Sequence, residues 1–154
     1  MAQHPAVNPP MRPTDLAFNQ SLGIIDAPPE AEHLMELPLS PGVQNHLGSM
    51  HAAAQFALAE AASAERLRRD YGTQAKDGLV VVRGVTVKYR RPALGTLLAF
   101  AHLEETAARH LREDLATRSR TVATVRVELK DLAGNLTFAG SFDWFIGVPE
   151  QPLA

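Results

Sequence analysis

The longest apolar stretch of the chain has the composition of a helix and carries one acidic residue in its middle. From Ser49 to about Arg69 no proline interrupts a run rich in alanine and leucine, which are strong helix formers. The first two-thirds of this run are apolar on nearly every side, and such a helix is normally enclosed by the rest of the protein. Residues 45–64 contain eight alanines, so a sheet could pack closely around it. The pattern predicts a thin, buried helix of about 30 Å, at ~1.5 Å per residue.

After this helix, the hydrophobic pattern changes to the alternation of half-buried strands. Residues 78–92, 95–104, 121–131 and 136–146 predict four antiparallel strands joined by short turns. The third is the most regular, and its expected inward residues are Ala123, Val125, Val127 and Leu129. In the first strand we expect Val81, Val85, Val87 and Tyr89 on one face. Arg83 shares their parity, which suggests either a subunit interface or a contact with a ligand.

Other segments complete a predicted α+β domain. Residues 1–13 hold four prolines and predict a disordered or loosely docked arm, leaving 14–154 as a single domain. Thr14 or Asp15 could cap a short helix with Leu16, Phe18 and Leu22 on its apolar side, ending near Gly23. Residues 31–39 predict a strand, and residues 105–118 predict a short surface helix.

Composition and charge exclude several classes of function. The 15 basic and 17 acidic residues give a net charge of −2, which argues against nucleic acid or an anionic membrane as a partner. Cysteine is absent, so thiol catalysis and thiolate metal sites are excluded, and a cytoplasmic location is expected. His46 and His51 do not have the spacing of a helical metal pair, and we expect no metal site.

The order of elements, together with the residues at the start of the long helix, resembles the hotdog-fold acyl-CoA thioesterases. The likeness is strongest to the phenylacetyl-CoA thioesterase-like branch and its uncharacterised relatives. In that family an antiparallel sheet wraps a long helix, which begins at Asn-x-x-Gly-x-x-His-Gly-Gly and carries an Asp or Glu two turns later. The matching residues here are Asn45, Gly48, His51, Ala52, Ala53 and Glu60. Tyr89, Pro92 and Ala93 resemble the family's Tyr-x-x-Pro-Ala.

The resemblance implies hydrolysis of a thioester at this helix. Glu60 would act as a nucleophile or as a general base toward water, and the backbone N–H of Ala52 would hold the oxyanion. Asn45 would orient the water or the carbonyl group, and His51 would hold the loop or polarise the substrate. Each of these residues also has a plain structural interpretation: a helix glutamate, a turn asparagine, and a histidine bonded to the backbone at a helix start.

The resemblance also predicts the partners. Lys88, Arg90 and Arg91 would bind the phosphates of coenzyme A, although the same residues could simply form a solvated strand end. Coenzyme A would enter as part of the substrate, with no separate cofactor. The family closes its sheet by dimerisation, so we expect a homodimer or tetramer with Glu60 of one chain near Asn45 and His51 of the other.

Two departures from the family motif leave an alternative open. Ala52 and Ala53 replace paired glycines, and Val82 occupies a strand position that is polar in many catalytic members. A non-catalytic module that binds an acyl group or CoA is therefore the alternative to a hydrolase. Hydration of an enoyl-CoA would normally need an Asp/His pair in this fold, and the spacing here suits it less well.

Overall fold

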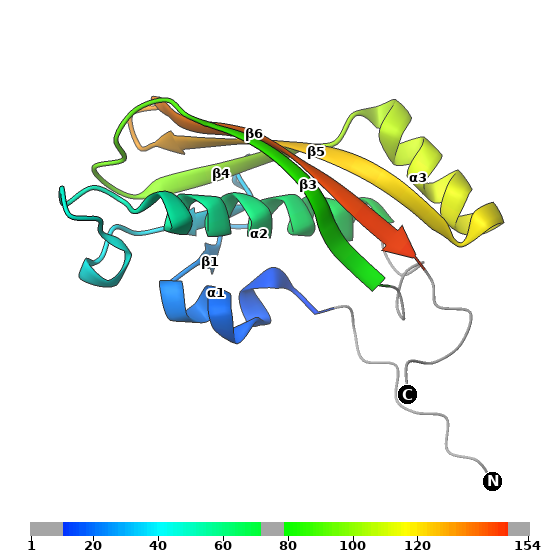
Figure 1. Cartoon of the computed structure of the whole chain (residues 1–154), viewed down its shortest axis with the longest axis horizontal. Helices are drawn as coiled ribbons and strands as arrows, with labels where there is room; N and C mark the ends of the chain where they lie inside the picture. The colour runs from blue at the N-terminus through cyan, green and yellow to red at the C-terminus, as the bar shows by residue number, and fades with distance from the viewer. Residues whose placement is uncertain (1–10, 72–78, 148–154) are drawn as a thin grey trace, which may run out of the picture.

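The computed structural model describes residues 11–71 and 79–147. These residues form a six-stranded antiparallel sheet, with a long helix, α2 (Ala52–Tyr71), lying across it (Figure 1). The strands follow the order β1-β2-β4-β5-β6-β3 across the sheet. Their bounds are β1 (Ile25–Asp26), β2 (Met35–Leu37), β3 (Leu79–Tyr89), β4 (Leu97–His102), β5 (Arg120–Asp131) and β6 (Leu136–Gly147). The predicted long helix wrapped by an antiparallel sheet is confirmed.

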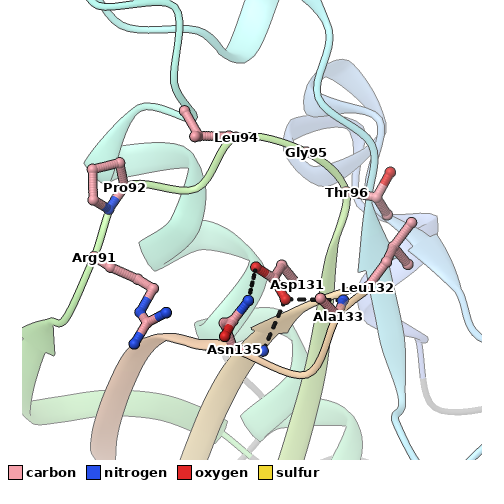
Figure 2. Close-up of a pocket in the computed structure, with 9 residues that line it drawn as sticks. All are labelled: Arg91, Pro92, Leu94, Gly95, Thr96, Asp131, Leu132, Ala133 and Asn135. Carbon is pink, nitrogen blue, oxygen red and sulfur yellow. Dashed lines mark hydrogen bonds between the residues drawn. The ribbon is translucent and has the colours of Figure 1, made fainter.

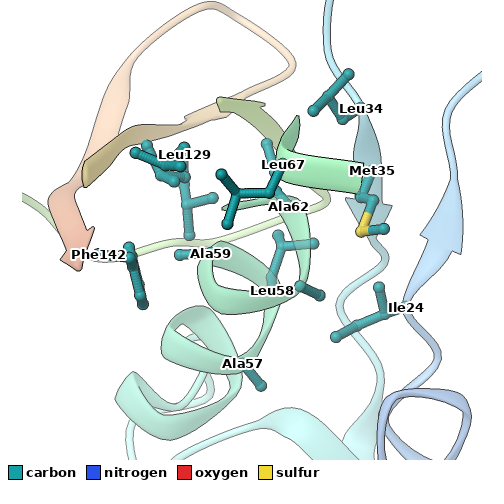
Figure 3. Packing of buried hydrophobic residues seen from close by; sticks show 14 of the residues in the cluster. Ile24, Leu34, Met35, Ala57, Leu58, Ala59, Ala62, Leu67, Leu129 and Phe142 are labelled. Carbon is teal, nitrogen blue, oxygen red and sulfur yellow. The ribbon is translucent and has the colours of Figure 1, made fainter. Parts of the chain in front are cut away.

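The core lies between α2 and the face of the sheet that it covers. Leu58, Ala59 and Ala62 are fully buried along the helix. Opposite them, the sheet contributes side chains such as Leu129 and Phe142 (Figure 3). Because alanine has only a methyl group, the helix axis can approach the strands closely and large sheet residues can fill the space between them. This explains why so many alanines occur in α2.

Shorter helices surround this central pair of layers. They are α1 (Ala17–Leu22), α3 (Glu105–Arg118) and the one-turn 3-10 helices η1 (Pro13–Asp15) and η2 (Pro41–Val43). The predicted bounds of α3 are confirmed, and its buried side, which includes Leu111 and Leu115, packs against β5. Between residues 11 and 71 and between 79 and 147, every helix is too short or too polar to cross a membrane.

The N-terminal segment, residues 11–22, differs from its sequence prediction. Leu16 precedes the first turn of α1 without a side-chain cap, so neither Thr14 nor Asp15 caps this helix. Leu16 and Phe18, predicted for the apolar side of this helix, are 45% and 65% exposed. The helix does end at Gly23, whose φ of 87° needs a residue without a Cβ. Most of the predicted arm, residues 1–10, lies outside the described residues.

Strand β3 contains a bulge, which changes the side of the sheet to which some of its residues point from the side predicted. Val82 is opposite Trp144 on β6, but the next paired residue is Gly84, so Arg83 is an extra residue. Before the bulge Val80 and Val82 face the core, and after it Val85 and Val87 do. The prediction that Val81 points inward is therefore wrong, and Arg83 is exposed on the outer side.

Two boundaries also differ from the sequence patterns. Strand β1 was not predicted, because a two-residue strand has no alternation to detect. The strand predicted over residues 31–39 is limited to β2, whose Met35 and Leu37 are fully buried. Helix α2 begins at Ala52 instead of Ser49, because residues 44–51 form a loop closed by a bridge between Gln44 and Met50.

Candidate active site

Glu60 lines a cavity between α2 and the N-terminal segment. The cavity has a volume of about 330 Å³, within the size range of small-molecule sites. The N-terminal segment and α2 contribute most of its lining, and the sheet contributes one residue each from β3 and β6. Its lining residues are Met11, Pro13, Leu16, Phe18, Asn19, Glu60, Ala61, Ala64, Tyr71, Val80 and Trp144. Glu60 is the one carboxylate among these residues, and no basic side chain accompanies it.

Two glutamates of α2 have opposite electrostatic environments. Burial raises the pKa of Glu60, and its carboxylate has no hydrogen bond to any described residue. Burial would also raise the pKa of Glu65, but hydrogen bonds from Arg68 and Arg69 outweigh it, so the pKa of Glu65 is lowered. Glu65 is thus a paired structural group, whereas Glu60 is a half-buried carboxylate with no cationic partner among the described residues. Desolvated, unpaired carboxylates are common at catalytic sites.

A buried polar connection lies beside this cavity. The Trp144 indole Nε1–H donates a hydrogen bond to Ser63 Oγ at 3.0 Å, and the Ser63 hydroxyl donates to the carbonyl oxygen of Glu60 at 2.7 Å. Ser63 is fully buried and Trp144 is 5% exposed. These hydrogen bonds therefore hold β6 against α2 close to Glu60.

The start of α2 holds the other three predicted catalytic residues. His51 Nδ1 accepts a hydrogen bond from the N–H of Ala53 at 3.0 Å, so His51 caps the helix. The N–H of Ala52 donates no hydrogen bond to a described residue, and Ala52 is exposed. An amide in this position is an available donor with a favourable helix dipole behind it.

Asn45 holds the loop that leads into α2. Its Oδ1 accepts hydrogen bonds from the N–H groups of Leu47 and Ser49, and its Nδ2 donates to Ser49 Oγ. The side chain is thus occupied within its own loop, where Gly48 adopts a φ of 76°. Within the described residues, the contacts of the Asn45 side chain are those of a turn residue.

Within one protomer, Glu60 and the helix start are not brought together. Eight residues separate Ala52 from Glu60 along α2, which corresponds to ~12 Å along the helix axis. A water molecule or thioester in contact with Glu60 would therefore be out of reach of the Ala52 amide of the same chain.

The basic residues Lys88, Arg90 and Arg91 lie at the end of β3 and are all exposed. They are near the start of α2, because the hydroxyl of neighbouring Tyr89 donates a hydrogen bond to the carbonyl oxygen of Ala52 at 3.0 Å. None of the three forms an ion pair with another described residue.

Arg91 also lines an open depression of about 520 Å³ between the β3–β4 loop and the β5–β6 hairpin (Figure 2). The only acidic residue of this lining is Asp131, whose side chain is bonded to Asn135 and to the N–H of Ala133. Hydrogen bonds from Asn135 lower the pKa of Asp131. The positive charge of Arg91 also lowers this pKa, so Arg91 is close enough to Asp131 to attract it, although the two side chains form no ion pair.

In the described part of the chain, no group of three or more His, Asp or Glu side chains is arranged to hold a metal ion. Sequence reasoning identified Glu60 but missed the walls of its cavity. The segment that contains Trp144 was predicted only as a strand over residues 136–146, and the N-terminal segment only as a short helix with an apolar side. Their convergence depends on tertiary packing over more than 80 residues, and no local pattern signals it.

Comparison with known protein families shows which family the chain belongs to. Residues 27–146 match the family described as Domain of unknown function (DUF4442). The chain belongs to the DUF4442 family. No curated protein sequence matches this DUF4442 protein significantly.

Solved structures resemble the DUF4442 protein over most of its length. A protein of unknown function and probable thioesterase from Pseudomonas aeruginosa has a TM-score of 0.74 at 24% identity, covering 88% of this chain and 89% of that one. A Bacillus halodurans protein solved with CoA has a TM-score of 0.64 at 17% identity, covering 84% and 74%. This likeness confirms the predicted hotdog fold.

A Staphylococcus aureus protein, called a thioesterase enzyme, has a TM-score of 0.65 at 14% identity, covering 86% of this chain and 99% of that one. It was solved as variants in which a glutamine and, separately, a glutamate fifteen positions later were replaced by alanine.

Proposed function

We propose that this DUF4442 protein hydrolyses an acyl-CoA thioester, with Glu60 as general base or nucleophile. The observation that carries the proposal is the environment of Glu60: a carboxylate in an apolar cavity, without a hydrogen-bond partner among the described residues and with a pKa raised by burial. A desolvated carboxylate is a stronger base than a hydrated one. An apolar cavity around it suits the acyl part of a thioester.

The proposal requires a second copy of the chain. Because the Ala52 amide is too far from Glu60 in the same protomer, the oxyanion donor would come from a partner. The free edge of β3 supports such a partner: β6 is its one strand neighbour among the described residues, and Leu79 and Val81 are exposed along it. An edge of this kind readily pairs with another strand. A twofold dimer through β3 would give two equivalent sites.

The same partner would also supply the phosphate contacts. Since Tyr89 joins the end of β3 to the start of α2, Ala52 and the basic cluster of Lys88, Arg90 and Arg91 belong to one end of a protomer. A partner that brings its Ala52 amide to Glu60 would bring those cations to the CoA arm as well. Arginine suits phosphate oxygens because its guanidinium donates two parallel hydrogen bonds.

The reaction proceeds in the general-base form as follows. Glu60 takes a proton from a water molecule as the water oxygen bonds to the thioester carbonyl carbon, and the Ala52 N–H binds the oxyanion. When the tetrahedral intermediate collapses, the carbon–sulfur bond breaks and the thiolate of CoA takes the proton back from Glu60. The products are a carboxylic acid and free CoA. Loss of one oxyanion donor typically costs ~10²–10³ in rate.

Similar proteins support this reaction. The fifteen-residue separation of the substituted glutamine and glutamate in the Staphylococcus aureus thioesterase equals the separation of Asn45 and Glu60 here. The Bacillus halodurans structure was solved with CoA, the leaving group that the proposal requires.

A non-catalytic acyl-CoA binding module is the second candidate. Val82 packs against the core from β3, and the hydroxyl of Ser63 is occupied by Trp144 and the Glu60 carbonyl. Among the described residues that line the cavity, no serine or threonine therefore orients the carboxylate or a water molecule.

Thiol release from a panel of acyl-CoA esters separates the two candidates. We expect Glu60→Gln to lower the rate by ~10²–10⁴, the usual contribution of a general base. Glu113→Gln is the matched control, because Glu113 is an exposed glutamate on α3. If the wild-type protein releases thiol no faster than Glu60→Gln, the hydrolase proposal is wrong.

A further inference from the structure

We propose that the N-terminal segment is the specificity wall of the Glu60 cavity and selects an apolar acyl group of about ten non-hydrogen atoms. The inference rests on the proposed function, because it takes an acyl-CoA as the ligand. It adds the class of acyl group and assigns Phe18 and Leu16 as the residues that set its size. Neither residue is part of the motif at the start of α2.

The first support is the position of the apolar side chains. Met11, Leu16 and Phe18 are all exposed, and yet all three line the cavity opposite Glu60. Exposed apolar side chains that gather around a concave site generally mark a ligand or partner surface. Here they converge on the single carboxylate of the lining, so the ligand that covers them would reach the reactive group as well.

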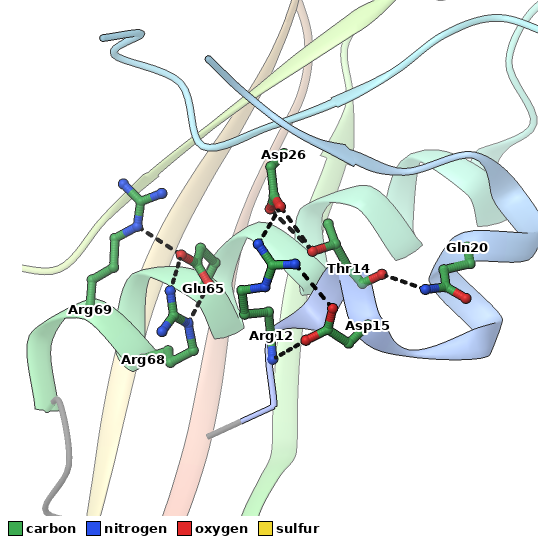
Figure 4. Close-up of polar contacts among 8 residues, drawn as sticks. All are labelled: Arg12, Thr14, Asp15, Gln20, Asp26, Glu65, Arg68 and Arg69. Carbon is green, nitrogen blue, oxygen red and sulfur yellow. Dashed lines mark hydrogen bonds and ion pairs between the residues drawn. The ribbon is translucent and has the colours of Figure 1, made fainter. Parts of the chain in front are cut away.

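The second support is that the segment is anchored by its own polar contacts (Figure 4). Arg12 donates to Asp26 at 3.1 Å and to Asp15 at 3.1 Å, and the Thr14 hydroxyl contacts the same Asp26 carboxylate. On the inner side, Asn19 Nδ2 donates to the carbonyl oxygen of Pro13 at 2.9 Å, and both residues are buried. Asp26 belongs to β1, so these contacts fix the wall to the edge of the sheet.

The third support is the chemistry and size of the lining. Nearly all lining residues are apolar or aromatic, and none is basic, so an acyl group ending in a carboxylate would lack a cation and would face Glu60. At ~30 Å³ for a group about the size of a water molecule, a volume of about 330 Å³ holds roughly ten such groups. An octanoyl or a phenylacetyl group fits these limits, whereas acetyl leaves most of the cavity empty.

Trp144 provides a test that does not depend on hydrolysis. It is the only tryptophan of the chain and it lines the cavity, so its fluorescence reports on what enters. The probes are non-hydrolysable S-alkyl-CoA thioethers with chains from two to fourteen carbons. We expect affinity to rise about fourfold per added methylene, equivalent to ~0.8 kcal/mol, and to stop rising near eight to ten carbons.

Variants of the N-terminal segment test whether it sets this chain-length limit. Phe18→Ala should move the limit to longer chains and weaken binding of the optimal probe about tenfold, because the enlarged cavity is underfilled. Val122→Ala is the control, since Val122 is also an exposed apolar residue but lies on β5, outside both the Glu60 cavity and the Arg91 depression. Asp26→Asn tests the contacts that hold the N-terminal segment to β1. Asp26 is a positioning residue that does not line the cavity. Its replacement should make the chain-length limit less sharp.

The outcomes separate this inference from the proposed function. A chain-length profile that is the same in Phe18→Ala, Val122→Ala and the wild type overturns the inference, as does the absence of any Trp144 response to the thioethers. If binding shows the expected limit but thiol release does not depend on Glu60, the wall is supported and the hydrolase proposal fails. If hydrolysis depends on Glu60 but its chain-length preference ignores Phe18, only the inference fails.

Discussion

Trp144 on β6 and Ser63 on α2 are joined by a buried hydrogen bond, 81 residues apart in sequence. Replacing Ser63 with alanine would leave the indole N–H without a partner in the core, and a buried unsatisfied donor typically costs ~1–3 kcal/mol. We expect Ser63→Ala to lower the free energy of unfolding by this amount in urea denaturation. Thr124→Ala is the control, because Thr124 bonds Asp143 on the exposed face. If both variants lose the same free energy of unfolding, the burial of the Trp144–Ser63 hydrogen bond does not increase its contribution to stability.

The rate of hydrolysis should depend on the ionisation of Glu60. In the proposed mechanism the carboxylate is the active form, and burial raises its pKa above the usual range. We therefore expect kcat/KM to rise with pH through this raised pKa and then to reach a plateau. The pH profile of thiol release, recorded with a detection method that does not depend on pH, measures it. A rate that is already constant at pH 4.5 would be inconsistent with a raised pKa.

The raised pKa of Glu60 should make the folded protein less stable as pH rises, whereas it should make kcat/KM rise with pH. Since the pKa of Glu60 is higher in the folded state, the folded protein holds more protons than the unfolded chain between the two pKa values. The stability contributed by protonated Glu60 is present below the unfolded pKa of about 4.3 and is lost as pH rises through the folded pKa. Glu60→Gln should therefore be more stable than the wild type at pH 7 to 8, with a difference that shrinks toward pH 4. Urea denaturation of both proteins across this range tests the sign.

Blocking the free edge of β3 should separate the protomers. In a twofold dimer through this edge, lysines in place of Leu79 and Val81 would lie close to their own copies and repel them. We expect the double variant to sediment as a monomer at micromolar concentration and to lose thiol release. Val122→Lys on β5 is the control, because Val122 is exposed but lies on neither the β3 edge nor the Arg91 depression. A wild-type protein that is itself monomeric and active would exclude a site built from two chains.

The basic cluster should affect substrate binding more than chemistry. Arg91→Ala is expected to raise KM about tenfold for a CoA ester with little change in kcat, and the effect should diminish at high salt. A substrate that carries only the pantetheine arm lacks the nucleotide phosphates and should not discriminate between the two proteins. Arg112→Ala on α3 is the control for a change of surface charge. A fall in kcat with an unchanged KM would show that Arg91 does not bind the phosphates of CoA.

Sequence patterns predicted the elements whose burial follows a regular period. The alternation in β5 and the apolar spacing in α3 gave the correct segments because each element packs one face on the core. In β3 the same reasoning failed at Arg83, since a single inserted residue reverses the parity on one side of the bulge. Gly84, an isolated glycine inside the valine-rich strand, is the local sign of a bulge, but only the pairing with β6 shows that Arg83 is the inserted residue.

The candidate site was predictable where a motif carries it and not where packing builds it. Glu60 and the helix start share a fixed spacing in one stretch of chain. The cavity depends on Phe18, whose local pattern suggested only the apolar side of a short helix, and on Trp144, which reaches it from the last strand. Long-range contacts of this kind follow from the folded arrangement of the whole sheet, and local periodicity cannot encode them.

The loop that Asn45 closes has a consequence for the speed of ligand capture. Two N–H groups and the Ser49 hydroxyl are already bonded to the Asn45 side chain before any ligand arrives. An incoming thioester therefore would not have to order this loop, and the conformational entropy of its backbone has been lost during folding. Association at this end of α2 should accordingly be limited by diffusion and orientation, with no slow rearrangement of residues 45–51.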